Sequence, residues 1–68
     1  MITEIGIVAG EIWHDLDSHG ASAFSQIVQR LGRPRDLVLM SMGWLAREGH
    51  VVVKQAGGDY QVELRHNG

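Results

Sequence analysis

Histidines and acidic residues near the N-terminal end are the side chains of this chain that could bind a metal ion or transfer protons. Glu11 and His14 are three positions apart, as are His14 and Asp17, so each pair would share one face of a helix. His14 and His19 are five positions apart and do not share a face. Two side chains do not make a zinc site, which needs three or four protein ligands. We therefore predict an exposed polar face, with no metal site and no cofactor.

The sequence shows no other pattern that indicates an active site. It has no glycine-rich phosphate loop, no apparent serine–histidine–aspartate constellation and no cysteine. A chain of 68 residues also has little volume for a buried pocket. We expect a protein that is not an enzyme and binds no small-molecule ligand.

A cluster of arginines is the feature that could contact nucleic acid. Arg30, Arg33 and Arg35 flank the turn before the third predicted helix, whose first N–H groups could help them hold a phosphate. Arg47 and Lys54 complete this candidate set. The alternative is a solvated turn in which Arg33 or Arg35 pairs with the adjacent acid or with an acid elsewhere.

The charge balance limits what such a cluster could do. The formal net charge is −2, and residues 50–65 carry few cations. The first helix carries acids that would repel DNA: Glu4, Glu11, Asp15 and Asp17. Because about three to five phosphates could be met, DNA binding is possible but would be weak and salt-sensitive.

Apolar residues at helical spacing predict three helices. The first runs from about Thr3, a candidate N-cap, to between Ser18 and Gly20. The second follows Ser22, another candidate N-cap, and ends at Gly32. The third has Pro34 at its first position and ends near Glu48, before Gly49. The inner stripes are Ile5, Val8, Ala9, Ile12, Trp13 and Leu16, then Phe24, Ile27, Val28 and Leu31, then Val38, Met42 and Leu45.

Two short β-type segments follow, HVVVKQA and DYQVELR, separated by Gly57 and Gly58. The second alternates, with Tyr60, Val62 and Leu64 on one face. A Gly-Gly link between such segments predicts a tight hairpin.

The order of three helices and a hairpin resembles the winged helix-turn-helix superfamily along nearly the whole chain. LAREGHVVV, Leu45 to Val53, is similar to the exit from a recognition helix into the first wing strand. MITEIGIVAGEIWHDLDSHG together with DLVLMSMGWLAREG resembles a family of small stand-alone prokaryotic winged-helix proteins without assigned function. The resemblance implies a mainly helical α+β fold with a three-helix core, a short first strand near Ala21-Ser22 and a wing formed by residues 50–65. We expect one domain over residues 1–65 and a frayed tail over 66–68.

The third helix carries a second apolar stripe, Leu37, Met40 and Trp44, where a DNA-reading helix would carry polar side chains. An exposed stripe of this kind is typical of a protein interface. The alternative is that Trp44 or Leu37 packs under the wing or against the first helix.

Glycines inside predicted helices give weak support to the interface interpretation. Gly6 and Gly10 lie one turn apart beside Trp13, and Gly43 lies in the third helix. Each costs about 1 kcal/mol relative to alanine, and the missing side chain lets another backbone approach. That backbone could belong to the same chain or to a second copy.

Our leading prediction is a binding module that forms a homodimer or binds another protein, and a small DNA-binding regulator is the alternative. A cysteine-free chain fits the cytoplasm. No apolar run approaches the length of a membrane span, so we expect no membrane partner.

Overall fold

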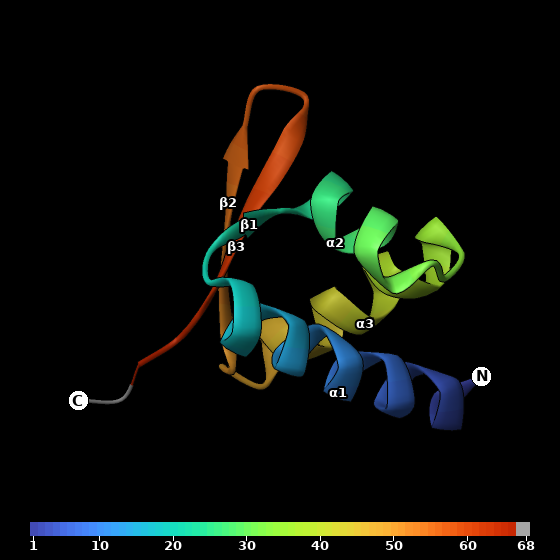
Figure 1. Ribbon diagram of the computed structural model, residues 1–68. Coiled ribbons are helices and arrows are strands. Elements are labelled where there is room, and N and C mark those ends of the chain that lie inside the picture. The colour runs from blue at the N-terminus through green and yellow to red at the C-terminus, as the bar shows by residue number, and fades with distance from the viewer. Residues whose placement is uncertain (67–68) are drawn as a thin grey trace.

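The computed structural model describes residues 1–66 and contains three helices and one three-stranded antiparallel sheet (Figure 1). In chain order the elements are α1 (Ile2–His19), β1 (Ser22–Ala23), α2 (Phe24–Leu31), α3 (Arg35–Arg47), β2 (Val51–Ala56) and β3 (Asp59–Leu64). The predicted α+β fold, with a three-helix core and a hairpin wing, is confirmed. Part of the predicted tail, residues 67–68, lies outside the described residues.

All three helix starts differ from the prediction, since α3 begins at Arg35 and Pro34 is its N-cap, not its first residue. Helix α1 begins at Ile2 with Met1 in the N-cap position, so Thr3 lies inside the helix. Helix α2 begins at Phe24, because Ser22 pairs with the sheet and its hydroxyl donates a hydrogen bond to the carbonyl of Gly20 (2.9 Å). Strand β1 therefore lies one residue further along than the predicted Ala21-Ser22.

The sheet has the order β1-β3-β2, so the last strand lies between the two earlier ones. Val62 at its centre is buried and faces Val53 on one side and Ser22 on the other. The predicted alternation along β3 is confirmed, since Gln61 and Glu63 are exposed. Gly57, at a φ of 56°, makes the tight turn that the glycine pair predicted.

The core is built from all three helices and the sheet. Its buried side chains are Val8, Ala9, Ile12, Leu16, Phe24, Ile27, Leu37, Val38, Met42, Leu45, Val51 and Val62. Leu37 is 9% exposed, so our prediction that it projects away from the interior is wrong. The buried stripe of α3 includes both Leu37 and Val38, because a core-facing stripe covers at least about 100° of a helix.

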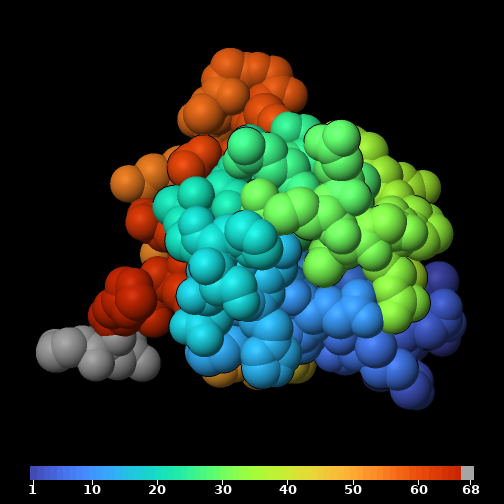
Figure 2. All heavy atoms as spheres, viewed as in Figure 1, coloured from blue at the N-terminus to red at the C-terminus, as the bar shows by residue number. Residues whose placement is uncertain are grey.

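The wing leaves one side of the helices uncovered. In Figure 1 the β2–β3 hairpin rises away from α1, and in Figure 2 its tip stands clear of the helical body. Helix α1 packs against α3. An apolar residue on the outer side of this helix pair is therefore not covered by the wing tip.

Candidate interaction surface

Two of the three residues in the second apolar stripe of α3 are exposed, as predicted. Met40 is 43% exposed and Trp44 is 47% exposed. Trp13 on α1 is 38% exposed, so its predicted place in the inner stripe of the first helix is wrong, and Ile2 is exposed as well. The alternative in which Trp44 is enclosed by the wing or by α1 does not hold.

Two hollows meet at Trp44 and Gly6 to form what we call the α1–α3 groove. The first has a volume of about 420 Å³ and is lined by Ile2, Ile5, Gly6 and Trp44. The second has a volume of about 290 Å³ and is lined by Gly6, Ala9, Gly10, Trp13, Trp44, Leu45 and His50. Trp44 lines both hollows, and its side chain is half exposed. The lining contains no Asp, Glu, Lys or Arg among the described residues.

The glycines next to the groove have free space above them. A Cβ atom placed on Gly6, Gly10 or Gly43 would meet no heavy atom within 4 Å outside the local helix backbone. A close contact within the chain therefore does not explain these glycines. The surface beside Trp44 is recessed because no side chain fills it.

Arg30 is held by residues of α1 and β1. Its Nε donates to Oδ1 of Asp15 (3.0 Å) and its Nη2 to Oδ2 (2.7 Å). The same Nη2 donates to the hydroxyl of Ser22 (2.7 Å). The hydrogen bonds to Asp15 raise the pKa of Arg30 above its usual value. These contacts join the end of α2 to the end of α1.

Arg33 is held in a similar way by Glu11. Its Nε donates to Oε1 (3.0 Å) and its Nη2 to Oε2 (2.5 Å), which raises the pKa of the guanidinium. The structure therefore agrees with the alternative in which an arginine of this turn pairs with an acid elsewhere, and the acid is Glu11 of α1. Two of the five predicted nucleic-acid residues are engaged by carboxylates.

The other three cations of the candidate set do not gather at one place. Arg35 lies over the ring of Phe24, 5.2 Å from its centre, at the start of α3. Arg47 lies at the opposite end of that helix, and Lys54 lies in β2. Within residues 1–66 none of the three forms an ion pair.

A contact between the wing and α2 was missed by sequence reasoning. Oδ2 of Asp59 accepts a hydrogen bond from the hydroxyl of Ser25 (2.6 Å), and Oδ1 accepts one from the backbone N–H of Tyr60 (2.7 Å). These bonds hold the pKa of Asp59 below its usual value, with the Ser25 hydroxyl as the largest cause. Asp59 also accepts from the N–H of Ser25, and so caps the first turn of α2 from another element. No local signal could reveal a pair 34 residues apart.

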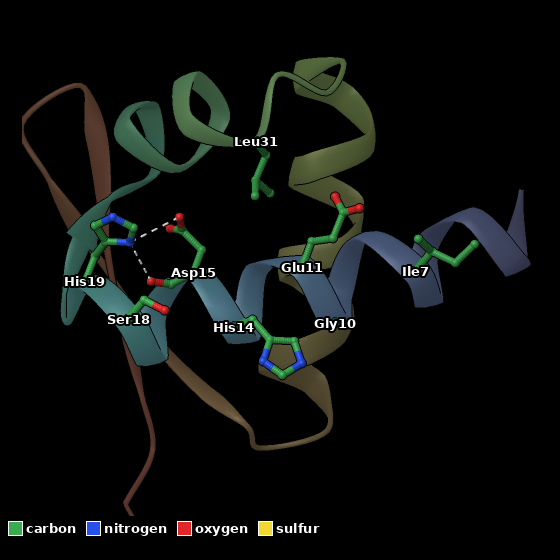
Figure 3. A pocket seen from close by; sticks show the side chains of 8 residues that line it. All are labelled: Ile7, Gly10, Glu11, His14, Asp15, Ser18, His19 and Leu31. Carbon is green, nitrogen blue, oxygen red and sulfur yellow. Dashed lines mark hydrogen bonds and ion pairs between the residues drawn. The ribbon is translucent and has the colours of Figure 1, made fainter.

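The polar residues of α1 line a shallow hollow on its outer side (Figure 3). Figure 3 shows Glu11 and Asp15 pointing toward the side of Leu31, whereas His14 points away from them. His19 contacts Asp15 through Nδ1, 3.4 Å from Oδ1. In the described part of the chain no three His, Asp or Glu side chains come together to hold a metal ion.

Comparison with known proteins agrees with this architecture. Residues 1–64 match the family described as "Winged helix-turn-helix domain (DUF2582)". The chain belongs to this family. The "Uncharacterized protein MJ1608" of Methanocaldococcus jannaschii is 34% identical over 65 residues, which cover 91% of each chain. No solved structure matches the chain.

The resemblance predicted from the sequence is thereby confirmed. Across residues 1–66 the structure contains no helix with the length and apolar character needed to cross a membrane. Neither the family description nor the name of the relative states an activity.

Proposed function

We propose that this winged-helix protein is a non-catalytic binding module that associates with another protein chain through the α1–α3 groove. The observation that carries the proposal is Trp44, a half-exposed side chain that lines two apolar hollows whose lining has no Asp, Glu, Lys or Arg among the described residues. Tryptophan beside an apolar pocket is typical of the centre of a protein interface.

Burial of Trp44 in an interface would contribute a substantial part of a binding free energy. An aromatic side chain such as Trp44 presents roughly 200 Å² when fully exposed, so half of it is about 100 Å². Covering that area contributes about 2.5 kcal/mol, which is the size of an interface hot spot. Trp13 and Met40 add further apolar area beside it.

Site-specific photocrosslinking in living cells tests the proposal. A benzophenone amino acid replaces Met40, which is one helical turn from Trp44 and exposed. The matched control replaces Ile7, an exposed apolar residue that lines the hollow on the other side of α1. We expect light-dependent protein adducts at position 40 well above the level at position 7. Equal labelling at both positions would refute the proposal.

DNA binding is a second candidate, favoured by one observation. Arg35, Arg47 and Lys54 form no ion pair within residues 1–66 and so could contact phosphates. Arg30 and Arg33 would first have to leave Asp15 and Glu11. We therefore expect weak binding that falls steeply with salt.

Fluorescence anisotropy with mixed-sequence duplex DNA in low salt tests this candidate. If DNA binds through these cations, Arg35→Ala combined with Lys54→Ala should weaken binding about tenfold and reduce the salt slope by about two. Absence of binding in low salt, where charges are least screened, would eliminate the candidate.

A further inference from the structure

We infer that the partner of the α1–α3 groove is a second copy of this chain, related by a two-fold axis, with Trp44 of each copy inserted beside Gly6 of the other. This inference rests on the proposed function and names the partner of the same surface. It follows from the shape, the charge and the size of the groove.

The relief of the groove is self-complementary. A two-fold interface brings the same patch from both copies together, so the patch must carry both the protrusion and the recess. In the inferred packing the half-exposed indole of Trp44 serves as the protrusion, and the hollows that it lines serve as the recesses. Gly6 lines both hollows and has open space above it, so a partner's indole ring has room to enter there.

Two copies with the same net charge repel each other least when they meet through a face without acidic residues, and within residues 1–66 the α1–α3 groove is such a face. Each copy has a formal net charge of −2. Glu11 and Asp15 lie along the hollow on the other side of α1, where Arg33 and Arg30 neutralise them. Contact through the α1–α3 groove brings together a lining with no Asp, Glu, Lys or Arg among the described residues. Its one titratable lining residue is His50.

The size of the face predicts a weak and reversible dimer. The 18-residue helix α1 is about 27 Å long, and two packed helices cover a width of about 20 Å. The footprint is therefore roughly 540 Å² per copy, or about 1,100 Å² in total, at the lower limit of specific interfaces. We expect a dissociation constant on the order of 1–100 μM.

Sedimentation velocity from about 1 to 500 μM tests the inference. The wild-type protein should shift from monomer to dimer over this range. Trp44→Glu should weaken association at least about 30-fold, because it places a carboxylate in an apolar contact. Ile7→Glu adds the same charge to an exposed position outside the groove, and should leave the dissociation constant within about threefold of wild type.

Gly6→Leu separates specific packing from general stickiness. The substitution enlarges the apolar surface, so non-specific association would become tighter. It also fills the recess at Gly6, so the inferred two-fold packing would become at least about tenfold weaker. An added Cβ meets no atom of the chain outside the local helix backbone, so the monomer should stay folded, and circular dichroism checks this. Gly10→Leu repeats the test in the second hollow.

The outcomes distinguish this inference from the proposed function. A wild-type protein that remains monomeric at about 500 μM overturns the inference, as does tighter association of Gly6→Leu. If photocrosslinking at position 40 then yields adducts with a different protein, the proposed function stands without the second copy. Adducts of twice the chain mass at position 40 support both.

Discussion

Arg30 and Asp15 form the ion pair that is least accessible to water. Their side chains are 28% and 7% exposed. The Arg33–Glu11 pair is more open to solvent on both sides. Breaking a shielded pair costs more than breaking an exposed pair, because the remaining charge is poorly hydrated. The two arginines therefore contribute unequally to stability.

We predict that Arg30→Met lowers the free energy of unfolding by about 1–2 kcal/mol, because Asp15 and Ser22 lose their donors. Arg33→Met should have a clearly smaller effect. Urea unfolding followed by circular dichroism measures both. Equal losses for the two variants would show that the exposure of the carboxylate does not decide the outcome.

The link between Asp59 and Ser25 predicts a pH effect. The pKa of Asp59 is lowered in the folded state, so its contribution to stability is fully present above the unfolded value of about 3.9. That contribution is lost as the pH falls through the lower folded pKa. Ser25→Ala removes the largest cause of the shift, and should move the pKa of Asp59 back toward its usual value. NMR titration of the Asp59 carboxyl measures this, and an unchanged pKa in the variant would contradict the assignment.

At the scale of the element, α3 presents two unlike apolar faces. Leu37 and Met40 are three positions apart, yet the first is buried in the core and the second is 43% exposed. Sequence periodicity placed both on one outer stripe. In the structure Leu37 packs inside, whereas Met40 stays exposed one helical turn from Trp44.

Alanine at these two positions should separate stability from association. We predict that Leu37→Ala lowers the free energy of unfolding of the monomer by about 2–4 kcal/mol, because it leaves a cavity in the core. Met40→Ala should change it by less than about 1 kcal/mol. Chemical unfolding at low protein concentration tests the pair. A comparable loss for Met40→Ala would place that side chain in the core.

The elements themselves were largely predictable from local signals. The helical stripes, the αL glycine after α2 and the glycine pair of the wing all act within a few residues, so their positions could be inferred from the chain alone. The N-caps were not, because the hydroxyl of Ser22 bonds to Gly20 and the N–H of Ala23 bonds to Gln26 instead. Partners distant in sequence, such as Asp59 for Ser25, Asp15 for Arg30 and Glu11 for Arg33, depend on how the elements pack.

The boundary between core and surface on α3 was only half predictable. At about 100° per residue, Leu37 lies only about 20° from Trp44 and about 60° from Met40 around the helix axis, so periodicity alone could not separate the buried residue from the exposed ones. Exposure of Trp44 depends on where the wing lies, and no periodicity in the sequence specifies that direction. The candidate surface was therefore identified through its residue types, and its outline required the packed molecule.

At the scale of the whole molecule, small size makes association consequential. A domain of 68 residues has a modest core and only marginal stability. Only folded chains can dimerise through the α1–α3 groove, so dimerisation stabilises the folded state by mass action. Folding and association are then coupled.

We predict that the midpoint of thermal unfolding rises by roughly 5 °C when the wild-type concentration is raised from about 1 to about 100 μM. The midpoint of Trp44→Glu should be independent of concentration over the same range. Differential scanning fluorimetry or calorimetry measures both. A midpoint that does not move for wild type would contradict a dimer that contributes to stability.

The position of β3 between β1 and β2 has a consequence for synthesis of the protein. Both pairings use the last-made of the three strands, so the backbone of β2 and of the short β1 stays unpaired until β3 is being added, and Val51 has no partner until Leu64 has been made. The helices have local hydrogen bonds and need not wait. A nascent chain should therefore expose an open edge of valines from Val51 to Val53 for a short time, and a chaperone that recognises extended apolar segments would meet it there.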